Sequence, residues 1–175
     1  MNKKLSGVIV MVVGVLLVFA AAGLYAGTEV KEVIEMKNKA YAKHKKGIVM
    51  FTHEKHQDEY AKKHPELYEK GCGECHHDKD NKPLTELKEG DAVENCIECH
   101  KKLGEMSKAD KKKMKKDKVP KDEVKSKKLE FHGEALHYNC RGCHKLYNKK
   151  IKKMDPKPEK APTTCKKCHP KVKKK

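Results

Sequence analysis

The stretch Cys72-Gly73-Glu74-Cys75-His76-His77 joins a C-x-x-C pair to two consecutive histidines. Its first five positions recur three times further along the chain. The other copies are Cys96-Ile-Glu-Cys99-His100, Cys140-Arg-Gly-Cys143-His144 and Cys165-Lys-Lys-Cys168-His169. All eight cysteines of the 175 residues therefore belong to four copies of one motif, and each copy ends in a histidine.

The spacing favours covalent haem attachment over disulfides or zinc. An even number of cysteines in an exported chain would suggest disulfides, and paired C-x-x-C units would suggest zinc. Neither explains a histidine after every second cysteine. Attachment of a c-type haem requires it, because two thiols bind the two vinyl groups and the adjacent histidine becomes the proximal iron ligand. The motifs predict four covalent haems with four proximal ligands, His76, His100, His144 and His169.

The composition shows why the chain would need such cofactors. It contains 42 lysines and arginines against 25 acidic residues, a formal net charge of +17, and no tryptophan. So polar a chain lacks the apolar side chains for an ordinary core and would normally be disordered. Four large apolar macrocycles would supply the missing core.

Residues 1–26 are typical of a secretory signal peptide. Lys3 and Lys4 precede an apolar run, and the segment ends in Leu24-Tyr25-Ala26. Residues 5–26 are nearly free of charge and could instead form a membrane anchor. Either interpretation predicts an exported, periplasmic protein, with a tetrahaem domain at 27–175.

Beyond the motifs, the chain resembles the class III multihaem cytochromes of the tetrahaem cytochrome c3 type. The resemblance rests on Phe51-Thr-His53-Glu-Lys-His56, the doubled His76-His77 and the three later motifs. It covers about residues 30–169. It implies a mainly α fold with irregular loops wrapped around four haems and a small N-terminal β-hairpin.

The resemblance also implies which histidines complete the iron coordination. His53 would be the second ligand of the first haem, His56 of the third and His77 of the second. His76 and His77 would then bind two different irons.

The fourth haem has two candidate ligands. Family spacing favours His137, three residues before the first cysteine of the third motif. A helical wheel instead places His132 on the apolar arc of a helix over 129–138. We favour His137, because Gly133 weakens that helix. His44 and His64 lie among lysines and are expected at the surface.

Several elements can be predicted coarsely. Residues 30–36 and 48–52 are expected to pair as strands, and 54–64, 94–103 and 129–138 to form helices. Residues 155–164, with three prolines, are expected to form a loop. The lysine-dense insert 101–128 is expected to be either a solvated, partly helical flap or a docking surface for an acidic redox partner. Nucleic acid is a poor fit, because aromatic residues and arginine are scarce.

These expectations lead to a function. If each iron carries two histidines, no coordination position is open to a substrate, so we expect an electron carrier rather than an enzyme. Two imidazoles without methionine favour a low potential. The resemblance implies anaerobic respiration with hydrogenases, dehydrogenases or membrane cytochrome complexes as partners. The alternatives are a membrane-tethered or assembled conduit subunit and a reductase with one open haem.

Overall fold

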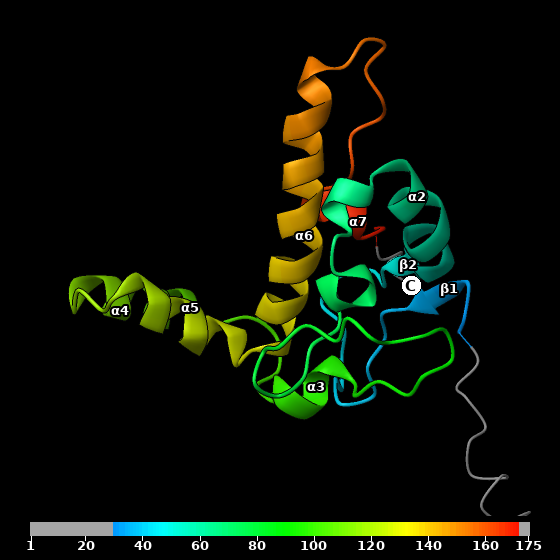
Figure 1. Cartoon of the computed structure of the whole chain (residues 1–175). Helices are drawn as coiled ribbons and strands as arrows, with labels where there is room; N and C mark the ends of the chain where they lie inside the picture. Colours follow the sequence, from blue (N-terminus) through cyan, green and yellow to red (C-terminus); the bar gives the residue numbers. More distant parts are fainter. Residues whose placement is uncertain (1–29, 172–175) are drawn as a thin grey trace, which may run out of the picture. The chain divides into compact units, whose positions relative to one another are not determined.

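The computed structural model describes residues 30–171, of which 30–88 and 93–171 form one compact unit (Figure 1). The predicted signal peptide or anchor at 1–26 lies outside the described residues, so this prediction stays open. Across 30–171, no helix combines the length and apolar character needed to cross a bilayer.

A two-stranded antiparallel sheet opens the unit. Strand β1 (Val33–Glu35) pairs with β2 (Met50–Thr52), and Ile34 stands opposite Phe51. β-branched and aromatic residues favour such a pleated surface. The predicted N-terminal hairpin is confirmed, with shorter strands than expected.

Short helical segments follow β2. They are the π-helical turn η1 (Lys55–Tyr60), α2 (Ala61–Lys63), and the 3-10 turns η2 (Pro65–Leu67) and η3 (Gly71–Glu74). The helix predicted at 54–64 is thus present, although most of it is wound as a π-helix. The helix predicted at 94–103 is a single turn, α3 (Cys96–Cys99), capped by the Asn95 side chain.

The lysine-dense insert forms two helices, α4 (Lys108–Lys116) and α5 (Lys121–Leu129). The Ser107 side chain caps α4 by accepting a hydrogen bond of 3.0 Å from the Asp110 backbone N–H. Pro120 precedes α5, and Asp122 and Glu123 occupy its first turn, where acidic residues suit the helix dipole. We call these two helices and their 117–120 connection the lysine hairpin.

The longest element of the described residues is α6 (His132–Lys150), the tall helix in Figure 1, which continues into the 3-10 turn η4 (Ile151–Lys153). The predicted helix at 129–138 was wrong in its boundaries. Leu129 ends α5, and Phe131 makes bridges to Lys101 and Lys102 before α6 begins. Residues 155–164 form a loop, as predicted, and lead to α7 (Cys165–Cys168).

Few apolar side chains are buried. Among the described residues they are Met106, Met114, Ala135 and Ile151. Several large apolar side chains are exposed, including Leu146 at 62% and Tyr138 at 57%. The protein part of the unit therefore has only a small core of its own.

Candidate haem iron centres

Each C-x-x-C pair lies within one helical turn. The second and fourth pairs coincide with α3 and α7, the third lies inside α6, and the first lies in and just after η3. Residues three apart in a helix share one face. In α6 this puts Cys140 and Cys143 on one face, with His144 one residue further.

The eight cysteines form no disulfides with one another, and thiols of different motifs lie near one another. Burial, followed by the nearby Cys140 and Cys143 thiols, raises the pKa of Cys75 to about 12. Burial also raises the pKa of Cys140, with Cys168 and Cys96 as the next causes. The four attachment motifs thus converge, as four haems held in one small unit would require.

The histidines meet in pairs, and each pair joins one motif histidine to one from elsewhere. Their ring centroids lie 6.3 Å apart for His53 and His76, 6.2 Å for His56 and His144, 5.9 Å for His77 and His100, and 6.3 Å for His137 and His169. Within 30–171, histidine, cysteine and carboxylate side chains do not gather in threes to hold a metal ion by themselves.

Backbone carbonyls fix the orientation of most of these rings. The Nδ1 atoms of five histidines are hydrogen bonded to carbonyl oxygens: His56 to Thr52, His77 to Asp78, His100 to Leu129, His144 to Pro162 and His169 to Gly47. Such a bond fixes the tautomer and leaves Nε2 as the nitrogen available to a metal. The donor set therefore fits iron ligation by neutral imidazole.

Partial burial lowers the pKa of several rings. It is the main cause that lowers the pKa of His56, opposed by the Thr52 carbonyl and assisted by His144 and His53. Burial also lowers the pKa of His76, with His53 and His77 as further causes. Neutral imidazole is the form that binds a metal.

His53 and His137 differ from the five carbonyl-bonded histidines. The Nδ1 of His53 is buried and has no hydrogen-bond partner among the described residues. The Nδ1 of His137 is also buried and lies 2.7 Å from Oε1 of Glu105, a short contact that is not aligned as a hydrogen bond.

His132 has a different environment from His137. It is buried at 6% exposure, and its Nδ1 is hydrogen bonded to the Tyr41 hydroxyl at 2.9 Å. His44 also stacks on Tyr41, with ring centroids 5.4 Å apart. His64 lies against Tyr147 and 3.7 Å from Glu66. Within residues 30–171, none of these three makes a ring contact with a motif histidine.

Sequence reasoning missed two residues here, Tyr41 and Glu105. Tyr41 bonds His132, which is 91 positions away, and also accepts a 3.0 Å hydrogen bond from the Gly104 N–H. Neither residue belongs to a motif, and no local pattern could have identified partners so far apart in the sequence.

Comparisons with known proteins agree with the motifs. The chain has no significant match among curated proteins or solved structures. The sequence model of the class III cytochrome c family matches residues 30–169, which include all four motifs and every paired histidine. This range agrees with the resemblance seen in the sequence, and the chain belongs to the class III cytochrome c family, whose members carry covalent c-type haem and transfer electrons.

Proposed function

We propose that this protein is a periplasmic, low-potential carrier with four covalent haems, each held by two cysteines and two histidines. A bound haem supplies an iron that takes up and releases one electron. The proposed iron ligand pairs, in order of motif, are His76 with His53, His100 with His77, His144 with His56, and His169 with His137.

The spacing of the histidine pairs carries this proposal. A metal–nitrogen bond is about 2.0–2.1 Å and a ring nitrogen lies about 1 Å from its ring centre, so an iron between two imidazoles separates the centroids by roughly 6 Å. The observed separations run from 5.9 to 6.3 Å. Direct contact between the rings would not require the same centroid separation in all four pairs.

Adjacent ligands explain how the haems would be held as neighbours. His76 and His77 are consecutive yet pair with different partners, His53 and His100. His53 and His56, three positions apart, also belong to different pairs. Each short segment would thus fix two irons, which suits electron exchange within one molecule.

The small core is a second line of support. Four buried apolar side chains cannot stabilise a unit of this size, and small domains commonly depend on cofactors instead. Side chains such as Leu146 and Tyr138, which are largely exposed, are available to contact a bound macrocycle.

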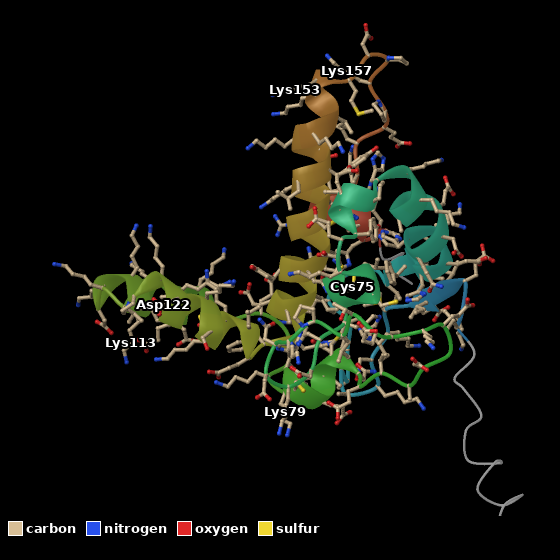
Figure 2. The ribbon with its side chains drawn as sticks, viewed as in Figure 1. Cys75, Lys79, Lys113, Asp122, Lys153 and Lys157 are labelled. Carbon is tan, nitrogen blue, oxygen red and sulfur yellow. The ribbon has the colours of Figure 1, made fainter. Side chains whose placement is uncertain are left out.

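The lysine hairpin supports an acidic redox partner. Helix α4 carries six lysines and one aspartate, and α5 carries four lysines and two acidic residues. Figure 2 shows nitrogen-tipped side chains on both the upper and the lower side of the lysine hairpin, with Lys113 labelled on the lower side. The lysine hairpin is joined to α6 by the Lys111–Glu134 ion pair and by Lys125, whose Nζ lies 4.6 Å from the Tyr138 ring centre. Tyr138 is adjacent to His137, so the docking surface would lie beside the fourth haem.

The test is the intact mass of the exported protein combined with its spectrum. Four haem additions, an entirely low-spin ferric spectrum and no carbon monoxide binding on reduction are expected. Fewer additions would overturn the haem number. A haem that binds carbon monoxide would favour a reductase, and a retained N-terminal segment in the membrane fraction would favour a tethered conduit subunit.

A further inference from the structure

Glu105 occupies an unusual place among the groups around the paired histidines. Its Oε1 lies 2.7 Å from the buried Nδ1 of His137. In five of the other paired histidines, this nitrogen meets a backbone carbonyl instead. His137 is thus distinguished by a carboxylate as the nearest polar neighbour of its second nitrogen.

The backbone around Glu105 is held firmly in place. The Gly104 N–H donates to the Tyr41 hydroxyl at 3.0 Å, and the Gly104 carbonyl accepts a 2.7 Å hydrogen bond from the Gly133 N–H. On the other side of Glu105, Met106 is buried at 6% exposure. Glu105 is therefore fixed between two anchored neighbours, so its approach to His137 follows from the fold.

The rings of this pair also have the steepest mutual angle. His137 and His169 lie at 89°, against 31° for His56 and His144. His169 is fixed by its 2.8 Å bond to the Gly47 carbonyl. Among the described residues, Glu105 makes the polar contact that can fix the plane of His137.

We propose that Glu105 is a positioning residue for His137, holding the imidazole perpendicular to His169 and strengthening it as an electron donor. The proposal rests on the ligand pair of the fourth haem given above. A carboxylate on Nδ1 makes the imidazole a stronger ligand than a carbonyl does. Stronger donation and nearby negative charge both stabilise ferric over ferrous iron, so Glu105 lowers the potential of the fourth haem.

Solvent limits the size of the effect. The side chains of His137 and Glu105 are 38% and 53% exposed, which screens the charge, although the Nδ1 atom itself is buried. We expect a shift of about tenfold in the ferric-to-ferrous equilibrium, the lower end of outer-shell effects on metal affinity. For a one-electron couple this corresponds to about 59 mV.

The test compares Glu105→Gln with a matched control, Glu123→Gln, in the haem-loaded protein. Both changes remove one negative charge, but Glu123 pairs with Lys127 rather than with an iron ligand. Only in Glu105→Gln should the potential of the haem attached to Cys165 and Cys168 rise, by an amount equal to about a tenfold shift of its equilibrium toward ferrous iron. Proton resonances identify this haem. Glu105→Asp should recover part of the original value.

A second readout follows the ring plane. Perpendicular axial imidazoles give a low-spin ferric haem a larger g anisotropy in electron paramagnetic resonance than parallel ones. Glu105→Ala should reduce this anisotropy for one haem while all four stay low-spin.

The outcomes separate this inference from the proposed function. Unchanged potential and resonance signal in a low-spin, four-haem Glu105→Gln protein would overturn the role of Glu105 alone. A wild-type protein whose fourth haem is not ligated by His137 would overturn the ligand pair, and this inference with it. Equal shifts of the potential in Glu105→Gln and Glu123→Gln would show that net charge alone causes the effect. They would contradict a positioning role for Glu105.

Discussion

His137 and His132 are five residues apart on α6 and have unlike partners. The His137 ring faces His169 with centroids 6.3 Å apart, whereas the Nδ1 of His132 is hydrogen bonded to Tyr41. His137→Ala should therefore open one haem of the four, giving a high-spin ferric fraction of about a quarter and new carbon monoxide binding on reduction. The affected potential should rise, because one imidazole donor is lost.

His132→Ala is the matched control for that experiment. It should leave all four haems low-spin and should destabilise the fold, because the Tyr41 hydroxyl loses one partner at a buried site. A high-spin haem in His132→Ala, with none in His137→Ala, would exchange the roles of the two histidines. Optical and resonance spectra of the two variants decide the matter.

Two half-buried histidines, His56 and His76, predict how stability depends on pH. Burial lowers the pKa of His56 and of His76 below their ordinary value of 6.5. As pH falls through that value, the unfolded chain binds protons before the folded protein does, so the free energy of unfolding should decrease. The loss should begin near 6.5 and continue down to the lower folded-state pKa values.

Urea midpoints measured from about pH 8 to about pH 5 check this prediction above the range in which carboxylates titrate. The midpoint should fall with pH, and low-spin character should be lost only on unfolding, because protonated imidazole cannot bind iron and the unfolded chain binds protons first. A midpoint that stays level or rises over this range would contradict the assignment.

At the residue scale, the sequence is informative where chemistry is local. The cysteines and motif histidines could be proposed as haem-binding residues from the sequence alone, because covalent attachment demands a fixed spacing. Partner histidines came from the family resemblance, since His137 and His169 are 32 positions apart and no spacing relates them. Glu105 and Tyr41 could not be predicted, because their roles arise only when loop 104–106 packs against α6.

At the scale of elements, Gly133 shows how α6 meets the loop before α4. A Cβ at Gly133 would lie 2.5 Å from the Gly104 carbonyl oxygen. Gly133→Ala should thus force these segments apart and lower the free energy of unfolding by about 1–3 kcal/mol, despite alanine's better helix propensity. Thermal or urea unfolding of the haem-loaded variant measures this change.

Gly142, in the same helix, provides the comparison. A Cβ there meets nothing within 4 Å, so Gly142→Ala should be neutral or stabilising by up to about 1 kcal/mol. Equal effects at both positions would show that helix propensity, rather than the close approach to Gly104, determines the response.

The lysine hairpin predicts salt-dependent encounter with an acidic partner. Lys111 is already paired with Glu134, so the informative change is Lys112, Lys113, Lys115 and Lys116 to glutamine. Exposed charges are screened beyond about 10 Å at 0.1 M salt. The association rate with a small acidic ferredoxin should fall on the order of tenfold at low salt and much less at high salt.

The control removes the same charge elsewhere. The control set lies at the end of α6 and just beyond it: Lys149, Lys152, Lys153 and Lys157. Figure 2 labels Lys153 and Lys157 there, away from the lysine hairpin. Their replacement by glutamine should alter the rate less, with the haem spectrum unchanged in both variants. If both sets lower the rate equally, only net charge guides the encounter.

Element boundaries were harder to predict than element types. The wheel that favoured His132 used Leu129 and Phe131 as part of its apolar arc. Both precede the first residue of α6, where Phe131 bridges Lys101 and Lys102. That tertiary pairing separates α5 from α6, and helical periodicity alone cannot predict it.

At the scale of the whole molecule, the chain and its cofactors must fold as one system. Four apolar side chains are buried among the described residues, and Ile151 at 2% exposure is the most deeply buried of them. Charge adds to the difficulty, since a formal net charge of +17 repels itself on compaction. The composition alone predicted the shortage of apolar side chains. The proximity of the four motifs could be seen only in the folded structure.

Without haem attachment, the protein should therefore be unfolded rather than folded with empty haem sites. Replacing all eight cysteines by serine should give a chain with little cooperative unfolding and much reduced far-ultraviolet circular dichroism, because too little apolar surface remains to offset the conformational entropy. Replacing only Cys165 and Cys168 should remove one haem by mass and leave a folded protein with three low-spin haems or fewer. A cysteine-free chain that unfolds cooperatively near the wild-type midpoint would show that side chains suffice, and would remove the main physical reason for regarding the haems as the core.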